Sequence, residues 1–299
     1  MPVRVLETDF APVLMVDADA DAAWLQRRLQ DEGIVVHGTS ELGMAIRDTI
    51  EFAKAVRGEA PHWDHDRERG RLRRVGEWSP LFRSLSRARF DSSLVNRDHL
   101  KLLTKSGSGK AVDRRWELRI GLAAGAFAPF VKLHGEHENP DVSFYSSSMQ
   151  ILSQPGRWGV ECLVLHTTRD SKWLATVAAK ADQLEGLDVN RGFIALNLSR
   201  VIDTTVFESA LEDRLGRRTR GELQEVMERE LEIVATRIDR APFWNKIVRQ
   251  QIAGVLFHAD VVTAFDGRLA SLGIGRIVMR TADRPAIEAA HRLLRALGT

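Results

Sequence analysis

Two acidic residues stand where carboxylates are unusual, at the start of one predicted strand and inside another. Asp141 follows Pro140 and opens a predicted strand over 141–146. Glu161 interrupts the apolar run Trp158–Leu165. The Val and Leu content of that run, without polar alternation, predicts a strand covered on both faces. A carboxylate there is costly to bury, so we expect either a metal ion or an ion pair to compensate it.

The spacing of these acids predicts that they meet. Asp141 and Glu161 are 20 residues apart, as expected for adjacent strands of a hairpin. Glu117 shares a face of the predicted helix 111–126 with small residues such as Gly121, which would let that helix pack closely on the sheet. Carboxylate oxygens suit Mg²⁺ or Mn²⁺, and such an ion activates water and stabilises charge on a phosphate.

Each acid also has a structural interpretation. Asp141 after a proline is a common turn residue. Glu117 lies in the arginine-rich stretch Arg114–Arg119, where it can pair with a neighbouring guanidinium. Glu161 is the hardest of the three to explain as a surface residue.

The order of these residues resembles the PD-(D/E)XK nuclease superfamily, which has the restriction-endonuclease-like fold. The resemblance covers roughly residues 111–200 and rests on Glu117, Pro140-Asp141, Glu161-Cys162-Leu163 and the helix after them. It implies hydrolysis of DNA phosphodiester bonds with Mg²⁺ or Mn²⁺. Asp141 and Glu161 would be the metal ligands, and Glu117 would be an auxiliary acid.

One position departs from the family pattern. The family has a lysine two residues after the strand glutamate, where it orients the attacking water and stabilises charge, and this chain has Leu163. Some members supply the lysine from elsewhere, and the local candidates are Lys172 and Lys180 on the predicted helix 171–184. If neither reaches the acids, the resemblance implies a degenerate nuclease that binds DNA or acts as a scaffolding subunit without cutting.

A second group of possible ligands precedes Asp141. Imidazole and carboxylate together can hold Zn²⁺, but the spacing of this group matches no closed zinc pattern, which favours a solvated loop. The group consists of His134, Glu136, His137 and Glu138.

His166, at the end of the Glu161 strand, suits either a proton shuttle or a hydrogen-bonded strand terminator.

The distribution of charge is more informative than its sum. The net charge of +2 is too small to argue for nucleic acid. Residues 67–90, however, contain eight arginines and only two glutamates. This segment is either a solvated helical surface in an arginine-rich chain or a patch that contacts DNA phosphates. The predicted contacts are Arg67, Arg69, Arg71, Arg73 and Arg74.

The single cysteine, Cys162, excludes an intramolecular disulfide and suits a reducing cytoplasm. Its place in an apolar strand predicts an inert buried thiol. No apolar stretch approaches membrane-spanning length, and no secretory signal is visible. We therefore expect a cytoplasmic protein with no membrane partner.

The chain order predicts an α/β fold with a mixed central sheet flanked by helices. Residues 1–105 are expected to be a mainly helical region that contacts DNA or a partner. Residues 106–299 are expected to form the α/β domain, with a helical insertion at about 201–250. The segment 57–80 is expected to be a loop. The predicted helices are 22–32, 41–56, 81–90, 97–104, 111–126, 171–184 and 284–297, and the predicted strands are 3–6, 11–16, 130–135, 141–146, 157–166, 192–198, 252–257 and 274–280.

The resemblance and the chemistry predict a metal-dependent DNA endonuclease, in defence or repair. A different class remains open, an α/β protein whose acids are structural and whose charged helix 208–240 mediates assembly. Metal binding would distinguish the nuclease from this class, and turnover would distinguish it from a degenerate member. The sequence leaves open whether the protein is a homo-oligomer or needs a partner protein.

Overall fold

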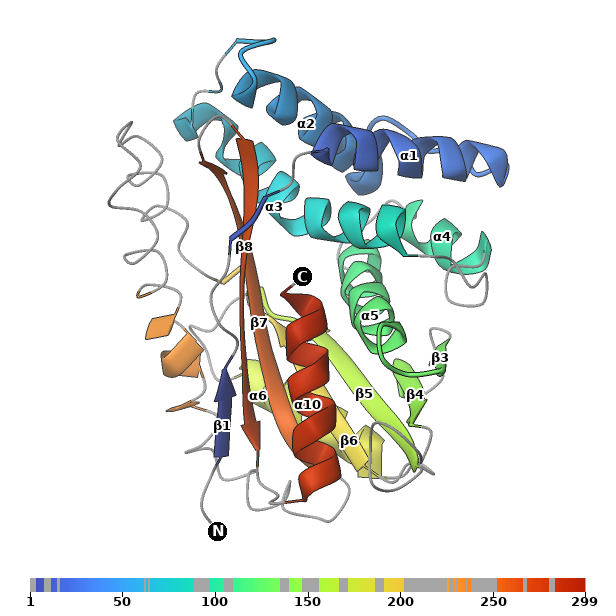
Figure 1. Cartoon of the computed structure of the whole chain (residues 1–299), viewed down its shortest axis with the longest axis vertical. Coiled ribbons are helices and arrows are strands. Elements are labelled where there is room, and N and C mark those ends of the chain that lie inside the picture. Colours follow the sequence, from blue (N-terminus) through green and yellow to red (C-terminus); the bar gives the residue numbers. More distant parts are fainter. Residues whose placement is uncertain are drawn as a thin grey trace.

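A computed structural model gives the architecture (Figure 1). It describes residues 4–7, 12–14, 17–61, 63, 65–88, 97–104, 110–134, 140–146, 156–166, 172–185, 191–201, 225, 228–229, 231–234, 236–237, 252–265, 268–279 and 283–298. The helices are α1 (Ala18–Asp31), α2 (Glu41–Val56), α3 (His65–Arg87), α4 (Arg97–Thr104), α5 (Lys110–Gly125), α6 (Lys172–Glu185) and α10 (Arg284–Leu297). The strands are β1 (Arg4–Glu7), β2 (Pro12–Leu14), β3 (Phe130–Leu133), β4 (Val142–Ser146), β5 (Gly156–Val164), β6 (Arg191–Asn197), β7 (Ile252–Phe265) and β8 (Arg268–Met279).

One mixed sheet contains all of these strands, in the order β1-β8-β7-β6-β5-β4-β3, with β2 paired to β8. The three strands β5, β6 and β7 run parallel to one another, and the remaining pairs are antiparallel. Where side chains are described, the parallel strands are mostly apolar and buried, as expected for strands covered on both faces. The predicted α/β class, a mixed sheet flanked by helices, is confirmed.

Helices cover both faces of the sheet. In Figure 1, α5 and α10 lie in front of the strands and α6 lies behind them. The front core joins α5 and α10 to inward residues of the strands, among them Phe144, Trp158 and Phe193. The rear core joins α6 to Ile194, Leu196 and their neighbours. Alternate residues of one strand therefore serve two separate cores, as the period of two in a β-strand requires.

The helix α5 approaches the sheet closely because it carries glycine at the contact. A Cβ added to Gly121 would lie 2.7 Å from Leu133 Cδ2 of β3. This agrees with the prediction that small residues on this helix face allow close packing.

The N-terminal region packs on the end of the same sheet. The helices α1, α2 and α3 lie against one another, and Leu25, Leu42 and Trp78 belong to the same apolar cluster as the front core. The two short strands β1 and β2 pair with β8. The predicted boundary near residue 105 falls in residues 105–109, outside the described ranges.

The prediction of a loop over residues 57–80 is wrong. Most of that segment belongs to the helix α3, which continues through Pro80 to Arg87. Its apolar residues recur at helical spacing and are fully buried, from Val75 and Trp78 to Leu85. The charged first half lacks such a stripe, and ion pairs to α2 hold it in place.

The two last strands are longer than predicted, since β7 runs to Phe265 and β8 begins at Arg268. The long β7–β8 pair extends past the centre of the sheet toward the N-terminal helices (Figure 1). There β2 pairs with β8, and α3 contacts both strands. Most of the predicted insertion at 201–250 lies outside the described residues. The described residues between 225 and 237 are helical.

Candidate active site

The acids Asp141 and Glu161 lie side by side in the structure. The register of the antiparallel pair β4–β5 sets Val142 opposite Val160, so Asp141 stands opposite Glu161 at the next position. On the other side, His134 N–H donates to the Asp141 carbonyl at 3.0 Å. We call His134, Asp141 and Glu161 the acid row. The hairpin predicted from their spacing is confirmed.

A lysine from α6 lies between the two acids. Lys180 Nζ donates to Asp141 Oδ2 at 2.9 Å and to Glu161 Oε2 at 2.6 Å. Asp141 Oδ2 also accepts from the Cys162 backbone N–H at 2.7 Å. The lysine reaches the sheet because Val177, Ala181 and Leu184 on its helix are buried in the rear core. Of the ways to compensate Glu161, the structure therefore contains the ion pair.

Burial controls the proton affinity of this cluster. The Glu161 side chain is 0% exposed, and the Lys180 side chain is 20% exposed. Burial and the nearby Asp141 carboxylate raise the pKa of Glu161 to about 8, although Lys180 opposes the change. Burial alone would lower the pKa of Lys180, but Asp141 and Glu161 raise it above its usual value. The ammonium therefore stays charged, and Glu161 exchanges a proton near neutral pH.

Glu117 comes from α5, on the other side of the sheet edge. Burial raises its pKa to about 7, with a further contribution from Asp141. Glu117 forms an ion pair with Arg114, and Arg114 also donates to the His134 carbonyl at 2.9 Å. The predicted pairing of Glu117 with a neighbouring arginine is thus present, alongside its proximity to Asp141.

The other candidates near the site lie farther away. Lys172 begins α6 and is exposed. It precedes Lys180 by eight residues, which is about 12 Å along a helix. His166 is exposed just after β5. Of the possible zinc ligands, His134 is buried and hydrogen-bonded to Ser143 Oγ at 2.8 Å, and 136–138 lie outside the described residues.

One residue of the site was missed by the sequence reasoning. Asp113 precedes Glu117 by one helical turn on α5, and burial together with Asp141 raises its pKa, against the influence of His166 and Lys180. The spacing of four residues on a helix was the available signal, because it places two carboxylates on one face.

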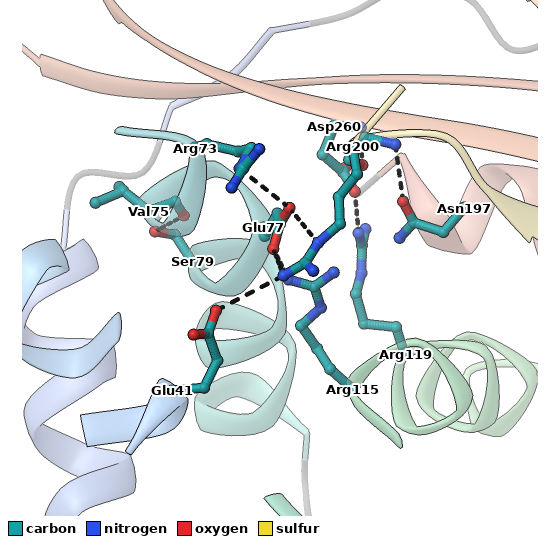
Figure 2. A network of polar contacts seen from close by, with 11 residues as sticks. Glu41, Arg73, Val75, Glu77, Ser79, Arg115, Arg119, Asn197, Arg200 and Asp260 are labelled. Carbon is teal, nitrogen blue, oxygen red and sulfur yellow. Dashed lines mark hydrogen bonds and ion pairs between the residues drawn. The ribbon is translucent and has the colours of Figure 1, made fainter. Parts of the chain in front are cut away.

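A buried arginine network fixes α5, as Figure 2 shows. Arg115 donates to Glu77 of α3 at 2.9 Å, and Arg200, just after β6, holds both oxygens of Glu77 at 2.8 Å. Four residues along α5, Arg119 pairs with the buried Asp260 of β7. The arginine-rich stretch therefore ties α5 to α3 and to the sheet, which positions Glu117.

The predicted phosphate-contacting arginines lie on α3 and have different surroundings. Arg71 and Arg74 are bound to the fully buried Asp48 of α2 at 2.9 and 3.1 Å. Arg71 also pairs with Glu51, and Arg73 lies 4.0 Å from Glu77. The side chains of Arg67 and Arg69 are exposed. Two of the five predicted contacts thus connect α3 to α2.

The carboxylate oxygens of Asp141 and Glu161 suit a divalent cation that is held by two carboxylates. Among the described residues, Glu161 Oε1 is a buried oxygen with no hydrogen-bond partner. A single ammonium already spans Asp141 and Glu161, so both carboxylates lie within reach of one cation. Within the same residues, no cluster of three or more His, Cys, Asp or Glu side chains could hold a metal ion. Mg²⁺ commonly uses one or two carboxylates together with substrate phosphate oxygens.

Cys162 is buried as predicted, and burial raises the pKa of its thiol well above the usual value. None of the helices in the described part of the chain is both long and apolar enough to span a membrane.

Comparison of the chain with known protein families, curated proteins and solved structures gave no match.

Proposed function

We propose that the chain is a metal-dependent nuclease of the restriction-endonuclease-like fold that hydrolyses DNA phosphodiester bonds. The supporting observation is the Asp141–Glu161–Lys180 cluster. It joins two carboxylates from adjacent strands to a lysine from the following helix. The position that the family reserves for lysine holds Leu163, which packs against the rear core instead.

The charge of each residue in the cluster would determine its catalytic role. Asp141 and Glu161 would hold Mg²⁺ or Mn²⁺, which supplies an activated water and neutralises charge on the phosphate. Lys180, with its ammonium kept charged by both acids, would orient the water and stabilise the transferring group. Glu117, with its pKa raised to about 7, suits transfer of a proton near neutral pH.

A degenerate nuclease that binds DNA without cutting is the second candidate. The observation that favours it is the completeness of the ion pair. Lys180 contacts both carboxylates, so the charge of Glu161 is compensated without a metal. In such a protein the cluster would serve stability alone.

Cleavage assays separate the two. We would incubate supercoiled and single-stranded circular DNA with Mn²⁺ or Mg²⁺, using wild type, Asp141→Asn, Glu161→Gln and Lys180→Met, with Lys172→Met as the matched control on the same helix. We expect the three cluster variants to lose about 100-fold or more in rate and the control to cut normally. Cutting that survives both acid substitutions would refute the proposal. No turnover and no Mn²⁺ binding by calorimetry in wild type, with DNA binding retained, would support the second candidate.

A further inference from the structure

Two large apolar side chains lie exposed and directly opposite each other at the sheet edge. Phe130 of β3 is 71% exposed, and Tyr145 of β4, the chain's single tyrosine, is 46% exposed. The register pairs them across the two strands. Directly opposed side chains share one face of a sheet, with Cβ atoms about 5 Å apart. On its other side, Tyr145 is paired with Arg157 of β5. We call these three cross-strand neighbours, Phe130, Tyr145 and Arg157, the aromatic row.

The aromatic row lies on the same sheet face as the acid row. Successive residues of a strand point to opposite faces, so Tyr145 shares a face with Asp141, and Arg157 shares one with Glu161. Four residues of strand separate the two rows, which is about 13 Å. That span corresponds to about four nucleotides of a stacked strand. Between the rows, the exposed Lys132 of β3 lies on this face as well.

The opposite face explains why these rings are not part of the core. There, Phe144 stacks on Trp158 at 6.2 Å between ring centroids, and Trp158 stacks on Phe193 at 5.7 Å. The alternation of the strands therefore assigns one set of aromatic residues to the core. Phe130 and Tyr145 belong to the other set, on the face that carries α6, and they are exposed there. Neither the front core nor the rear core, as formed by the described residues, includes this exposed pair.

The neighbours of the pair indicate its ligand. A lysine and an arginine accompany two aromatic rings, and this combination suits a chain of phosphates that carries flat bases. Single-stranded nucleic acid meets both requirements, since its phosphates attract cations and its bases can stack on rings. In a duplex, the faces of the bases are occupied by neighbouring bases, so the rings have no surface to contact.

We propose that the aromatic row is a stacking platform for unpaired bases, so that single-stranded DNA, or a single-stranded end of a duplex, is the substrate of the acid row. The identification of a substrate rests on the proposed nuclease function, whereas the binding itself does not. The platform would hold the strand while a phosphate about four nucleotides away lies at the acids.

The test measures binding without cleavage. In EDTA and on a Glu161→Gln background, fluorescence anisotropy would follow a single-stranded oligonucleotide of about 12 nucleotides, within the site sizes of such proteins. An abasic oligonucleotide of equal charge and a duplex would be compared with it. The variants are Phe130→Ala and Tyr145→Ala, with Tyr145→Phe as the conservative change. Val35→Ala is the matched control, because Val35 is also 71% exposed but lies between α1 and α2.

We expect each alanine variant to weaken single-strand binding by roughly 5- to 150-fold, and Tyr145→Phe and Val35→Ala to leave it unchanged. Binding of the abasic strand and the duplex should change little in any variant. Equal losses on all three ligands, or alanine variants that bind the single strand as Val35→Ala does, would overturn the platform. So would a dimer, detected by sedimentation, that Phe130→Ala dissociates without any effect on DNA.

The two proposals can fail separately. Aromatic-dependent binding without metal-dependent cutting by the unmutated chain would remove the nuclease function and leave the platform. Normal cutting and binding in both alanine variants would remove the platform and leave the nuclease function.

Discussion

Replacing Lys180 with methionine tests the cluster directly. Methionine keeps much of the length and apolar character of the lysine stem but removes the ammonium that contacts Asp141 and Glu161 at 2.9 and 2.6 Å. Glu161 is fully buried, so water cannot replace the lost partner. Charge-assisted hydrogen bonds of this kind contribute about 1.5–3 kcal/mol each, so we expect a loss of about that size in unfolding free energy at pH 7.

The loss should grow with pH, and its direction follows from the pKa of Glu161. In wild type that pKa is raised to about 8, so the folded state keeps a proton that the unfolded state releases above its ordinary value. Wild-type stability therefore falls between about pH 4.5 and pH 8 and then stops falling on this account. Without Lys180 the pKa rises further, and the variant continues to lose stability. The difference between variant and wild type should be roughly 1.4 kcal/mol larger at pH 9 than at pH 7.

Urea unfolding followed by tryptophan fluorescence at pH 6 to 9 would measure this difference, with Lys172→Met as the control. Lys172 is exposed on the same helix, so its replacement should change stability by less than about 0.5 kcal/mol at every pH. Added Mn²⁺ should restore part of the stability of Lys180→Met, because a cation held by both carboxylates would replace the ammonium. A Lys180→Met loss that is as small as the control's and independent of pH would refute the placement of Lys180.

Three further predictions concern other parts of the chain. Asp260→Asn should lower the unfolding free energy by about 3–5 kcal/mol at neutral pH, because the buried Arg119 would lose the carboxylate that neutralises its charge. Burial alone would raise the pKa of Asp260, but Arg119 holds it far below the usual range, so the difference from wild type in urea unfolding should shrink as the pH falls below about 4. Gly254→Ala should lower the melting temperature, with about 1–3 kcal/mol lost, because the new Cβ would lie 2.7 Å from a backbone oxygen of β8. Reversing charge at Arg67 and Arg69 should weaken DNA binding and reduce the slope of log affinity against log salt by about one per lost contact; an unchanged slope would exclude these two residues from the interface.

The sequence was most informative where one strong period governs a whole segment. The helices α2 and α10 begin and end where their apolar spacing predicted, at Glu41–Val56 and Arg284–Leu297. The apolar strands were also found, because burial on both faces leaves little choice of residue. The meeting of Asp141 and Glu161 followed from the short connection between their strands, which permits antiparallel neighbours.

The sequence was least informative where tertiary contacts override local composition. The first half of α3 is a run of charges with little apolar content, and its ion pairs to α2, which arginines such as Arg71 make with Asp48, support its helical form. Likewise, the partners of Arg115 and Arg119 lie 38 and 141 residues away, at Glu77 and Asp260. No local pattern contains such pairs. The choice between Lys172 and Lys180 also depended on which face of α6 meets the sheet.

The register of the β4–β5 pair connects the core to the candidate site. A slip of one residue would turn the side chains of β5 to the opposite faces. Glu161 would then enter the front core, where Trp158 now stacks between Phe144 and Phe193, and Trp158 would leave it. Both changes are strongly unfavourable, because one buries a carboxylate among aromatic rings and the other exposes an indole. The aromatic stack on the front face therefore fixes which residues stand on the rear face, and with them the position of Glu161 beside Asp141 and Lys180.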